Sequence, residues 1–284
     1  MSSALAKVTE NILRQLESGE ALPWRKPWNV PCPMSAGGRR YSGVNRVILS
    51  CANFRDHRWV TFNEAKKRGG SIRKGEKGTQ VILWKTYQRV EEDETARSGL
   101  ISQTFTVFNL EQCDGVEVAE AVSPSLFDAD IEESLNATIR GFESCPPIKF
   151  GGHRACYYPK HDVVQMPFQH HFESPSAYAS VMLHELAHSV GHPSRLNRFD
   201  PNAPIVKSDT SYGFEEMVAE LTSAMICSEI GIIDQGNQNA AYIQSWIRGM
   251  KEQKTFLSKA SALAERSASF ILGRNHDGEN ITNT

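Results

Sequence analysis

The sequence predicts an α+β protein of two domains, a small basic α+β domain followed by a mainly helical domain with a small sheet. The length of 284 residues suits two domains of ordinary size. Charge divides the chain in the same way, because residues 1–90 carry 17 Lys and Arg against 6 Asp and Glu, whereas residues 91–284 carry 14 against 27. Between the halves, 113–132 is acidic and contains no Lys or Arg. We therefore predict domains at 1–112 and 133–284, joined by a linker at 113–132.

The first domain is predicted to contain helices followed by strands. An amphipathic helix, with apolar residues at helical spacing, comes first, and a Pro/Gly-rich loop follows it. A later helix begins with Thr61 as its N-cap, and Glu64 completes a capping box. The two strands are rich in Val, Ile, Phe and Trp. The predicted segments are helices at 5–19, 45–54 and 61–68 and strands at 80–87 and 102–110.

The second domain is predicted to consist mostly of helices. Ser174 is placed to cap a helix whose first residue is Pro175, and Gly191 ends that helix. The predicted segments are helices near 131–142, 174–190 and 213–230, strands at 155–158 and 163–166, and one or two helices within 238–272.

The cysteines and the apolar segments bear on the compartment. The six cysteines are sparse and form no Cys-x-x-Cys pair, which predicts reduced thiols in a cytoplasmic protein. The first amphipathic helix is neither a signal peptide nor a membrane span, and no later stretch is long and apolar enough to cross a bilayer. We therefore predict a cytoplasmic protein with no membrane partner.

A His-Glu-x-x-His motif, His184-Glu185-Leu186-Ala187-His188, lies inside the helix predicted at 174–190. Residues four apart share one face of a helix, so both imidazoles can bind one metal ion. Glu185 is placed to accept a proton from water at that ion. The alternative is a pair of core histidines with a paired carboxylate. The helical context favours the metal site, because a buried glutamate between two histidines is costly without a function or partners.

The metal site needs a third protein ligand. A downstream histidine in the pattern His-x-x-Gly-x-x-His is excluded, because Ser194 stands in its place and His192 lies beyond the helix end. The next long helix carries Glu216 and Glu220 on one face, where two carboxylates repel unless a cation or a donor lies nearby. We predict Glu216 as the third ligand and Glu220 as the acceptor that orients a ligand imidazole, with Glu215 pointing elsewhere. Two surface glutamates are the alternative interpretation.

Three protein ligands leave one position open on the metal, which is typical of a catalytic rather than a structural zinc site. Zinc is the predicted cofactor, with manganese or another divalent ion as the alternative. The implied reaction is hydrolysis of a peptide bond, in which Glu185 takes a proton from water and passes it to the leaving amine. Tyr212 or Tyr242 is a candidate donor to the oxyanion; a core or surface position is equally compatible with either tyrosine.

The basic domain interleaves aromatic residues with cations, a pattern typical of proteins that bind single-stranded DNA. Cations contact the phosphates and aromatic rings stack on the bases. No helix-turn-helix is evident, which argues against duplex recognition. Trp24 and Trp28 lie beside prolines, so packing and base stacking are equally good interpretations of them. The residues predicted to contact DNA are Trp24, Arg25, Lys26, Trp28, Arg39, Arg40, Tyr41, Asn45, Arg46, Lys66, Lys67, Arg73, Lys74 and Lys77.

Nearly the whole chain, in order, resembles the ArdC-type antirestriction proteins. In the first half the resemblance rests on Pro-Trp-Arg-Lys-Pro-Trp at 23–28, on 41–45 and on 73–78. In the second half the matching residues are 184–188, 191–196, Tyr212, 215–221, Tyr242, Ile243 and Trp246.

The resemblance implies properties that composition does not show. The family is carried by mobile plasmids, binds single-stranded DNA and protects incoming DNA from restriction, and relatives of its N-terminal domain occur in conjugative-plasmid primases. The second half is expected to have the zincin metallopeptidase fold, with the metal on His184, His188 and a glutamate of the following long helix. A host protein, such as a restriction component, is the possible peptidase substrate.

Three functions stay open at the level of sequence. The protein could coat single strands without any peptidase activity, because the net charge of +11 over residues 1–90 is enough to bind a polyanion. It could instead be a DNA-tethered metallopeptidase that cleaves a host protein. A structural metal site in an interaction module is the third possibility.

Overall fold

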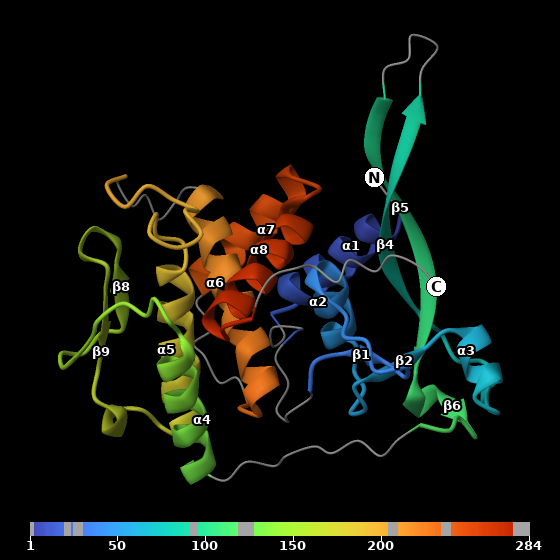
Figure 1. Ribbon diagram of the computed structural model, residues 1–284, viewed down its shortest axis with the longest axis horizontal. Helices are drawn as coiled ribbons and strands as arrows, with labels where there is room; N and C mark the ends of the chain where they lie inside the picture. Colours follow the sequence, from blue (N-terminus) through green and yellow to red (C-terminus); the bar gives the residue numbers. More distant parts are fainter. Residues whose placement is uncertain are drawn as a thin grey trace.

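The computed structural model shows two lobes that lie side by side (Figure 1). We call residues 3–118 the N-terminal lobe and residues 128–274 the C-terminal lobe. The residues that the structure describes are 3–19, 24, 31–90, 96–118, 128–203, 210–233 and 240–274.

The N-terminal lobe is built on a four-stranded sheet in the order β1-β2-β5-β4. β1 is parallel to β2, and β5 is antiparallel to both β2 and β4. The ribbon of β4 and β5 extends away from the body of the lobe in Figure 1, and a second small sheet pairs β3 with β6. The elements are α1 (Ser3–Glu17), β1 (Met34–Ser35), α2 (Gly43–Cys51), β2 (Arg58–Val60), α3 (Phe62–Lys67), β3 (Ser71–Ile72), β4 (Thr79–Val90), β5 (Ala96–Asn109) and β6 (Cys113–Asp114).

The helices and strands predicted for this lobe are present, with shifted ends. The Thr61 side chain accepts a hydrogen bond from the Glu64 backbone N–H at 3.2 Å, which confirms the N-cap. The Glu64 carboxylate, however, accepts from Arg68 at 2.7 Å instead of completing a capping box. Both long strands extend further towards the hairpin than predicted, because their antiparallel register is continuous from Thr79 to Val90.

The predicted linker at 113–132 is longer than the connection that the structure leaves. Its first two residues form β6, whose Cys113 and Asp114 pair with β3. At its other end, α4 already begins at Asp128. An acidic segment can still pair as a short strand or begin a helix. Composition alone therefore predicted a linker that extends too far at both ends. Residues 119–127 lie outside the described residues.

The C-terminal lobe is arranged around α6, which packs against α5, α7 and α8. On the other side of α5 lie α4 and a three-stranded sheet in the order β7-β9-β8, with β8 at one edge. Among the described residues, none of the helices combines the length and apolar character needed to span a bilayer. The elements are α4 (Asp128–Gly141), β7 (Ile148–Phe150), β8 (Cys156–Tyr158), β9 (Val163–Met166), α5 (Pro175–Ser189), α6 (Thr210–Ile230), α7 (Ala240–Glu252) and α8 (Phe256–Ile271).

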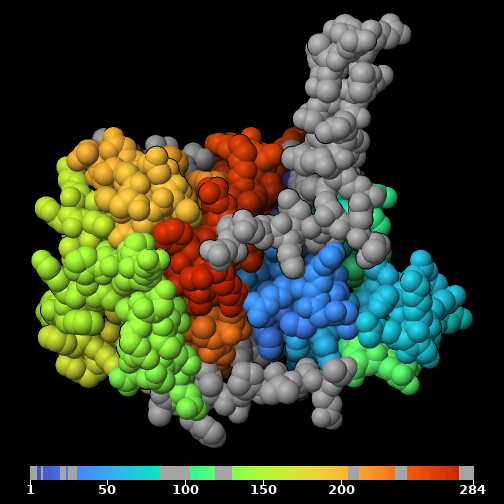
Figure 2. Space-filling model, in the orientation of Figure 1, coloured from blue at the N-terminus to red at the C-terminus, as the bar shows by residue number. Residues whose placement is uncertain are grey.

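One continuous hydrophobic core runs through both lobes. α1 packs against α7 and α2 packs against α8. Figure 2 shows the blue surface of the N-terminal lobe directly against the red surface of α8. The two lobes therefore share their core, because α1 and α2 bury apolar side chains against helices of the other lobe.

Candidate metal centre

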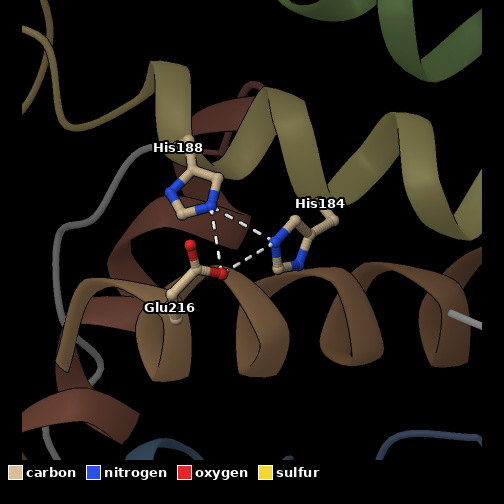
Figure 3. A group of neighbouring side chains, drawn as sticks. All are labelled: His184, His188 and Glu216. Atoms are coloured by element: carbon tan, nitrogen blue, oxygen red, sulfur yellow. Dashed lines mark hydrogen bonds and ion pairs between the residues drawn. The ribbon is translucent and has the colours of Figure 1, made fainter. Parts of the chain in front are cut away.

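Two helices bring three side chains to one point (Figure 3). α5 supplies His184 and His188, and α6 supplies Glu216. The two imidazole Nε2 atoms are 3.2 Å apart. Glu216 Oε2 lies 3.3 Å from Nε2 of His184 and 3.6 Å from Nε2 of His188. The structure thus brings together the three metal ligands that the sequence predicts.

The start of α5 fixes where the motif falls on the helix. The Ser174 side chain accepts from the Ala177 backbone N–H at 3.1 Å, and Pro175 occupies the first turn. Leu183, Leu186 and Ala187 are buried around the helix axis. Because most of the helix is enclosed, the face that carries both histidines meets α6, and His184 keeps part of its surface open.

The spacing of the three ligand atoms fits a small divalent cation. An ion bound tetrahedrally by nitrogen and oxygen at about 2.0–2.1 Å holds its ligand atoms about 3.3–3.4 Å apart. The observed separations of 3.2, 3.3 and 3.6 Å agree with that value. Glu216 Oε2 is also buried without a hydrogen-bond partner among the described residues, although buried carboxylate oxygens normally have one. A cation bound between the three atoms would satisfy it.

The three ligands shift one another's protonation. Burial raises the pKa of Glu216, but the imidazoles of His188 and His184 outweigh burial and bring this pKa well below its usual range. Burial lowers the pKa of His188, but the Glu216 and Glu215 carboxylates outweigh it and raise this pKa well above its usual value. A metal ion must therefore compete with a proton for the imidazoles, so binding releases protons.

A second carboxylate lies near the outer nitrogen of each imidazole. Glu215 Oε1 lies 3.6 Å from His188 Nδ1, and Arg198 donates to both oxygens of the Glu215 carboxylate. Glu220 Oε2 lies 3.9 Å from His184 Nδ1, on the side of the ring away from Glu216. Glu220 is thus placed beside a ligand imidazole, as predicted. The expectation that Glu215 points elsewhere is wrong, because it faces His188 and is fixed there by a cation from the loop after α5.

Glu185, the predicted catalytic base, is anchored to the edge of the small sheet. Its Oε2 accepts from the Tyr157 backbone N–H of β8 at 2.8 Å. The Tyr157 hydroxyl donates to Asp162, whose carboxylate also accepts from Arg195 at 2.9 Å. β8 is therefore held from both sides, and it fixes the position of the Glu185 carboxylate.

A cleft of about 620 Å³ opens beside the metal ligands, and His184, Glu185, Glu220 and Tyr242 line it. The Tyr212 hydroxyl lies 3.2 Å from the Tyr242 hydroxyl. Burial, followed by the charge of Glu216, raises the pKa of Tyr212, so its hydroxyl remains protonated and able to donate. His192 turns away as expected, and its Nδ1 lies 2.7 Å from Ser194 Oγ.

Three of the predicted DNA contacts are buried inside the protein, and the prediction is wrong for them. Arg46 is 2% exposed, donating to Glu229 at 2.8 Å and to the Met225 carbonyl at 2.7 Å. Asn45 is buried against β4. Trp24 is 7% exposed and packs against the C-terminal lobe. Local charge and aromatic content do not reveal which side chains turn inwards, so the sequence placed Asn45 and Arg46 on the surface and left packing and base stacking open for Trp24.

The other predicted DNA contacts divide into four groups. Tyr41 is half-buried, and burial raises its pKa to about 12. Arg40 is exposed but donates to Glu229 at 2.9 Å. Arg73 is likewise exposed but donates to Glu76 at 2.9 Å. The other exposed cations, whose role in DNA binding stays a prediction, are Arg39, Lys66, Lys67, Lys74 and Lys77. Arg25, Lys26 and Trp28 lie outside the described residues.

Comparisons with known proteins match both halves of this chain. Residues 2–109 match the family model for the N-terminal domain of anti-restriction factor ArdC, and residues 141–263 match that for a zincin-like metallopeptidase. The metal-free crystal structure of the antirestriction ArdC protein from the R388 plasmid has a TM-score of 0.78 and 33% identity, over 95% of this chain and 97% of that one. The chain belongs to the ArdC antirestriction family.

This ArdC-family protein also matches a second structure of the R388 protein and two relatives that differ from each other in length. The Mn(II)-bound structure of the R388 ArdC protein has a TM-score of 0.77 and 32% identity, over 97% of this chain and 99% of that one. DNA primase TraC of Escherichia coli is 33% identical over 94% of this chain, and this chain spans only 27% of the primase. A protein called y4eC from Sinorhizobium fredii is 31% identical over 96% of this chain and 92% of its own length. The zincin-like match and the Mn(II)-bound relative agree with a divalent metal as cofactor, and the ligand triangle of His184, His188 and Glu216 is the candidate site for it.

Several partners in the site were missed by sequence reasoning. Glu215 lies beside the ligand His188, Arg198 donates to Glu215, and the Tyr157 backbone N–H donates to the predicted base Glu185. Neither periodicity nor motif spacing could have found Arg198 or Tyr157, because each contact joins segments whose distance is set by packing. Glu215 had a signal, since it stands directly before Glu216 in a run of acidic residues.

Proposed function

We propose that this protein binds single-stranded DNA, protects incoming plasmid DNA from restriction, and carries a zinc-dependent peptidase in its C-terminal lobe. The observation that carries the peptidase part is the ligand triangle of His184, His188 and Glu216 beside a cleft that also holds Glu185. Three protein ligands, with a nearby carboxylate that is not one of them, are typical of a catalytic site, because a structural zinc site uses four protein ligands. DNA binding and protection are inferred from the family and from the exposed cations of the N-terminal lobe.

The residues of the cleft have separate tasks in this proposal. A bound zinc ion would polarise the scissile carbonyl and lower the pKa of water. Glu185 takes a proton from the attacking water, whose oxygen bonds to the carbonyl carbon. It delivers that proton to the leaving nitrogen as the C–N bond breaks. Tyr212 and Tyr242 offer neutral hydroxyls near Glu216 that can donate to the developing oxyanion.

Zinc is favoured over manganese by the chemistry of the ligands. Two imidazoles and one carboxylate form a common catalytic zinc set, and nitrogen ligands bind zinc more tightly than manganese. In a calorimetric titration of the metal-stripped protein, we expect one equivalent of either ion to bind, with zinc at least about 10-fold tighter. Glu216→Gln, which keeps the size of the side chain, should weaken both ions, whereas Glu133→Gln on the exposed face of α4 should change neither. Equal affinities for the two ions would contradict the assignment of zinc.

Glu185→Ala tests whether proteolysis is needed for protection. The substitution removes the proton acceptor but none of the three metal ligands, so metal and DNA binding should be unchanged. If protection comes from coating single strands, the variant protects incoming DNA as well as the wild type does. Measurements of transfer efficiency into a restricting host, together with affinity for a single-stranded oligonucleotide over a salt series, give both readouts. A wild-type protein that prefers duplex DNA, or whose affinity barely responds to salt, would contradict the DNA-binding part.

The second candidate function is a DNA-tethered metallopeptidase whose main activity is cleavage of a host protein. The position of β8 favours it. This edge strand lies next to Glu185, and its outer backbone groups, apart from the Tyr157 N–H that Glu185 occupies, can pair with an extended peptide. In this case Glu185→Ala loses protection although it still binds DNA and metal. The same experiment therefore separates the two functions.

A further inference from the structure

One tryptophan of the N-terminal segment reaches the metal centre of the other lobe. Trp24 is 7% exposed, and its ring centroid lies 6.0 Å from that of Trp246 on α7. Trp246 itself donates to the Gly213 carbonyl at 3.0 Å. Gly213 permits this contact, because a side chain there would collide with Ser245 where α7 crosses α6. The Trp24 ring therefore packs against a tryptophan whose position is fixed by the contact between α6 and α7.

The indole N–H of Trp24 points at a carboxylate beside a metal ligand. Nε1 lies 3.4 Å from Glu220 Oε1 in a buried hydrogen bond across 196 residues of sequence. The other oxygen of the same carboxylate, Oε2, lies 3.9 Å from His184 Nδ1. On the far side of the His184 ring, Nε2 faces Glu216. Trp24, Glu220, His184 and the metal position thus form one continuous row.

The chemistry of the side chains in this row determines which of them donate and which accept hydrogen bonds. An indole nitrogen can only donate, and a carboxylate can only accept, so Trp24 fixes one oxygen of Glu220. The Glu220 side chain is 6% exposed, and a buried carboxylate is held in place by its donors. Carboxylates at the outer nitrogen of a metal-binding histidine set the orientation and basicity of the imidazole. A donor that fixes the carboxylate acts on the ligand through it.

We propose that Trp24 is a positioning residue of the metal centre, so that the N-terminal lobe completes the metal site of the C-terminal lobe. The inference rests on the metal site proposed above. Trp24 directly precedes Arg25 and Lys26, two of the predicted DNA contacts. The segment predicted to meet DNA is therefore covalently continuous with a residue that supports the metal ligand.

The test is metal affinity of the full chain, measured by calorimetric titration of zinc into the metal-stripped protein. Trp24→Phe keeps an aromatic ring on Trp246 but removes the N–H. We expect it to weaken zinc binding by about 3- to 10-fold, less than the roughly 10- to 100-fold expected for Glu220→Ala, which acts on His184 directly. Trp59→Phe is the matched control, because Trp59 is equally buried but packs against Phe54 in the N-terminal lobe. It should leave zinc affinity unchanged.

A double-mutant cycle distinguishes positioning from general loosening. If Trp24 acts through Glu220, then Trp24→Phe in the Glu220→Ala background has no further effect beyond about 2-fold. Full additivity of the two losses, or wild-type affinity in Trp24→Phe, would overturn the proposal. Near-ultraviolet circular dichroism in chelator checks that each variant is folded. Should Trp24→Phe not fold, Glu220→Ala still decides, since unchanged zinc affinity in that variant overturns the proposal too.

Failure of this inference is distinguishable from failure of the metal site itself. If the wild-type protein binds no divalent ion, the proposed zinc site is wrong and the inference falls with it. If the wild type binds zinc and Trp24→Phe binds it equally well, the zinc site stands and only the role of Trp24 is rejected.

Discussion

At the scale of single residues, the support of the metal ligands depends on a buried ion pair. Arg198 donates to both Glu215 oxygens, to the Ala187 carbonyl at 2.9 Å and to Ser267 at 2.7 Å. Glu215 in turn faces His188. Burial raises the pKa of Glu215, but His188 and Arg198 outweigh it and keep this pKa below its usual value. The side chain is therefore charged in the folded protein and requires its cationic partner.

Arg198→Ala should strongly destabilise the C-terminal lobe, because it leaves the Glu215 charge buried and without its guanidinium. We expect a loss of about 3–5 kcal/mol in the free energy of unfolding, measured with urea in the presence of chelator. The control is Arg140→Ala, which breaks an exposed ion pair with Glu133 and should cost less than about 1 kcal/mol. Similar losses in the two variants would mean that the Arg198–Glu215 pair contributes no more than a surface pair.

At the scale of elements, α2 joins the sheet of one lobe to the helices of the other. Asn45 on this helix pairs with the backbone of β4, where its Nδ2 donates to the Ile82 carbonyl at 2.6 Å and its Oδ1 accepts from the Ile82 N–H at 2.7 Å. The amide side chain thus replaces a missing strand neighbour for Ile82. The next residue, Arg46, faces α6 and α8 instead. Neither side chain is free to bind DNA.

Asn45→Ala should leave two buried backbone groups of Ile82 without partners. At about 1–3 kcal/mol for each unsatisfied group, we expect a loss of roughly 2–6 kcal/mol in unfolding free energy. Asn63→Ala, at an exposed position of α3, should stay within about 0.5 kcal/mol of the wild type. Oligonucleotide affinity, measured where both variants are folded, should not change. A selective loss of DNA affinity in Asn45→Ala would restore its predicted role as a DNA contact.

At the scale of the whole molecule, a buried charge cluster ties the lobes together. Arg46 of α2 contacts Glu229 of α6 at 2.8 Å and Glu265 of α8 at 3.3 Å. Arg40 reaches the same Glu229 at 2.9 Å. Burial raises the pKa of Glu229, but the surrounding arginines, Arg46 foremost, outweigh burial and lower this pKa below its usual value. The contact between the lobes therefore depends on an ionised carboxylate.

Because the pKa of Glu229 is lowered in the folded protein, its contribution to stability is complete above the unfolded value of about 4.3. This contribution is lost as the pH falls through the folded-state pKa, since the unfolded chain then binds the proton first. We expect the urea midpoint of the wild type to fall between pH 5 and pH 3 more steeply than that of Glu229→Gln. The variant is expected to be less stable at pH 7, where Arg46 has lost its charged partner. Parallel pH profiles would exclude Glu229 as the titrating group.

The sequence by itself determined the features that depend on local geometry. The helical period places His184 and His188 on one face, and Ser174 and Pro175 set where that helix begins. In the following long helix the apolar residues form one face and Glu216 and Glu220 lie on another. The third metal ligand was therefore expected among the acidic residues of that helix. The division of charge located the cations that remain exposed, such as Lys66, Lys67 and Lys74.

Only the tertiary structure decided how residues distant in sequence meet. It turned Glu215 towards His188, brought Trp24 to Glu220, and buried Arg46 between α6 and α8. The physical reason is that backbone periodicity fixes the direction of a side chain around its own helix, whereas the partner it meets depends on how whole elements pack. One core shared between the lobes is a property of that packing, and no local pattern in either half encodes it.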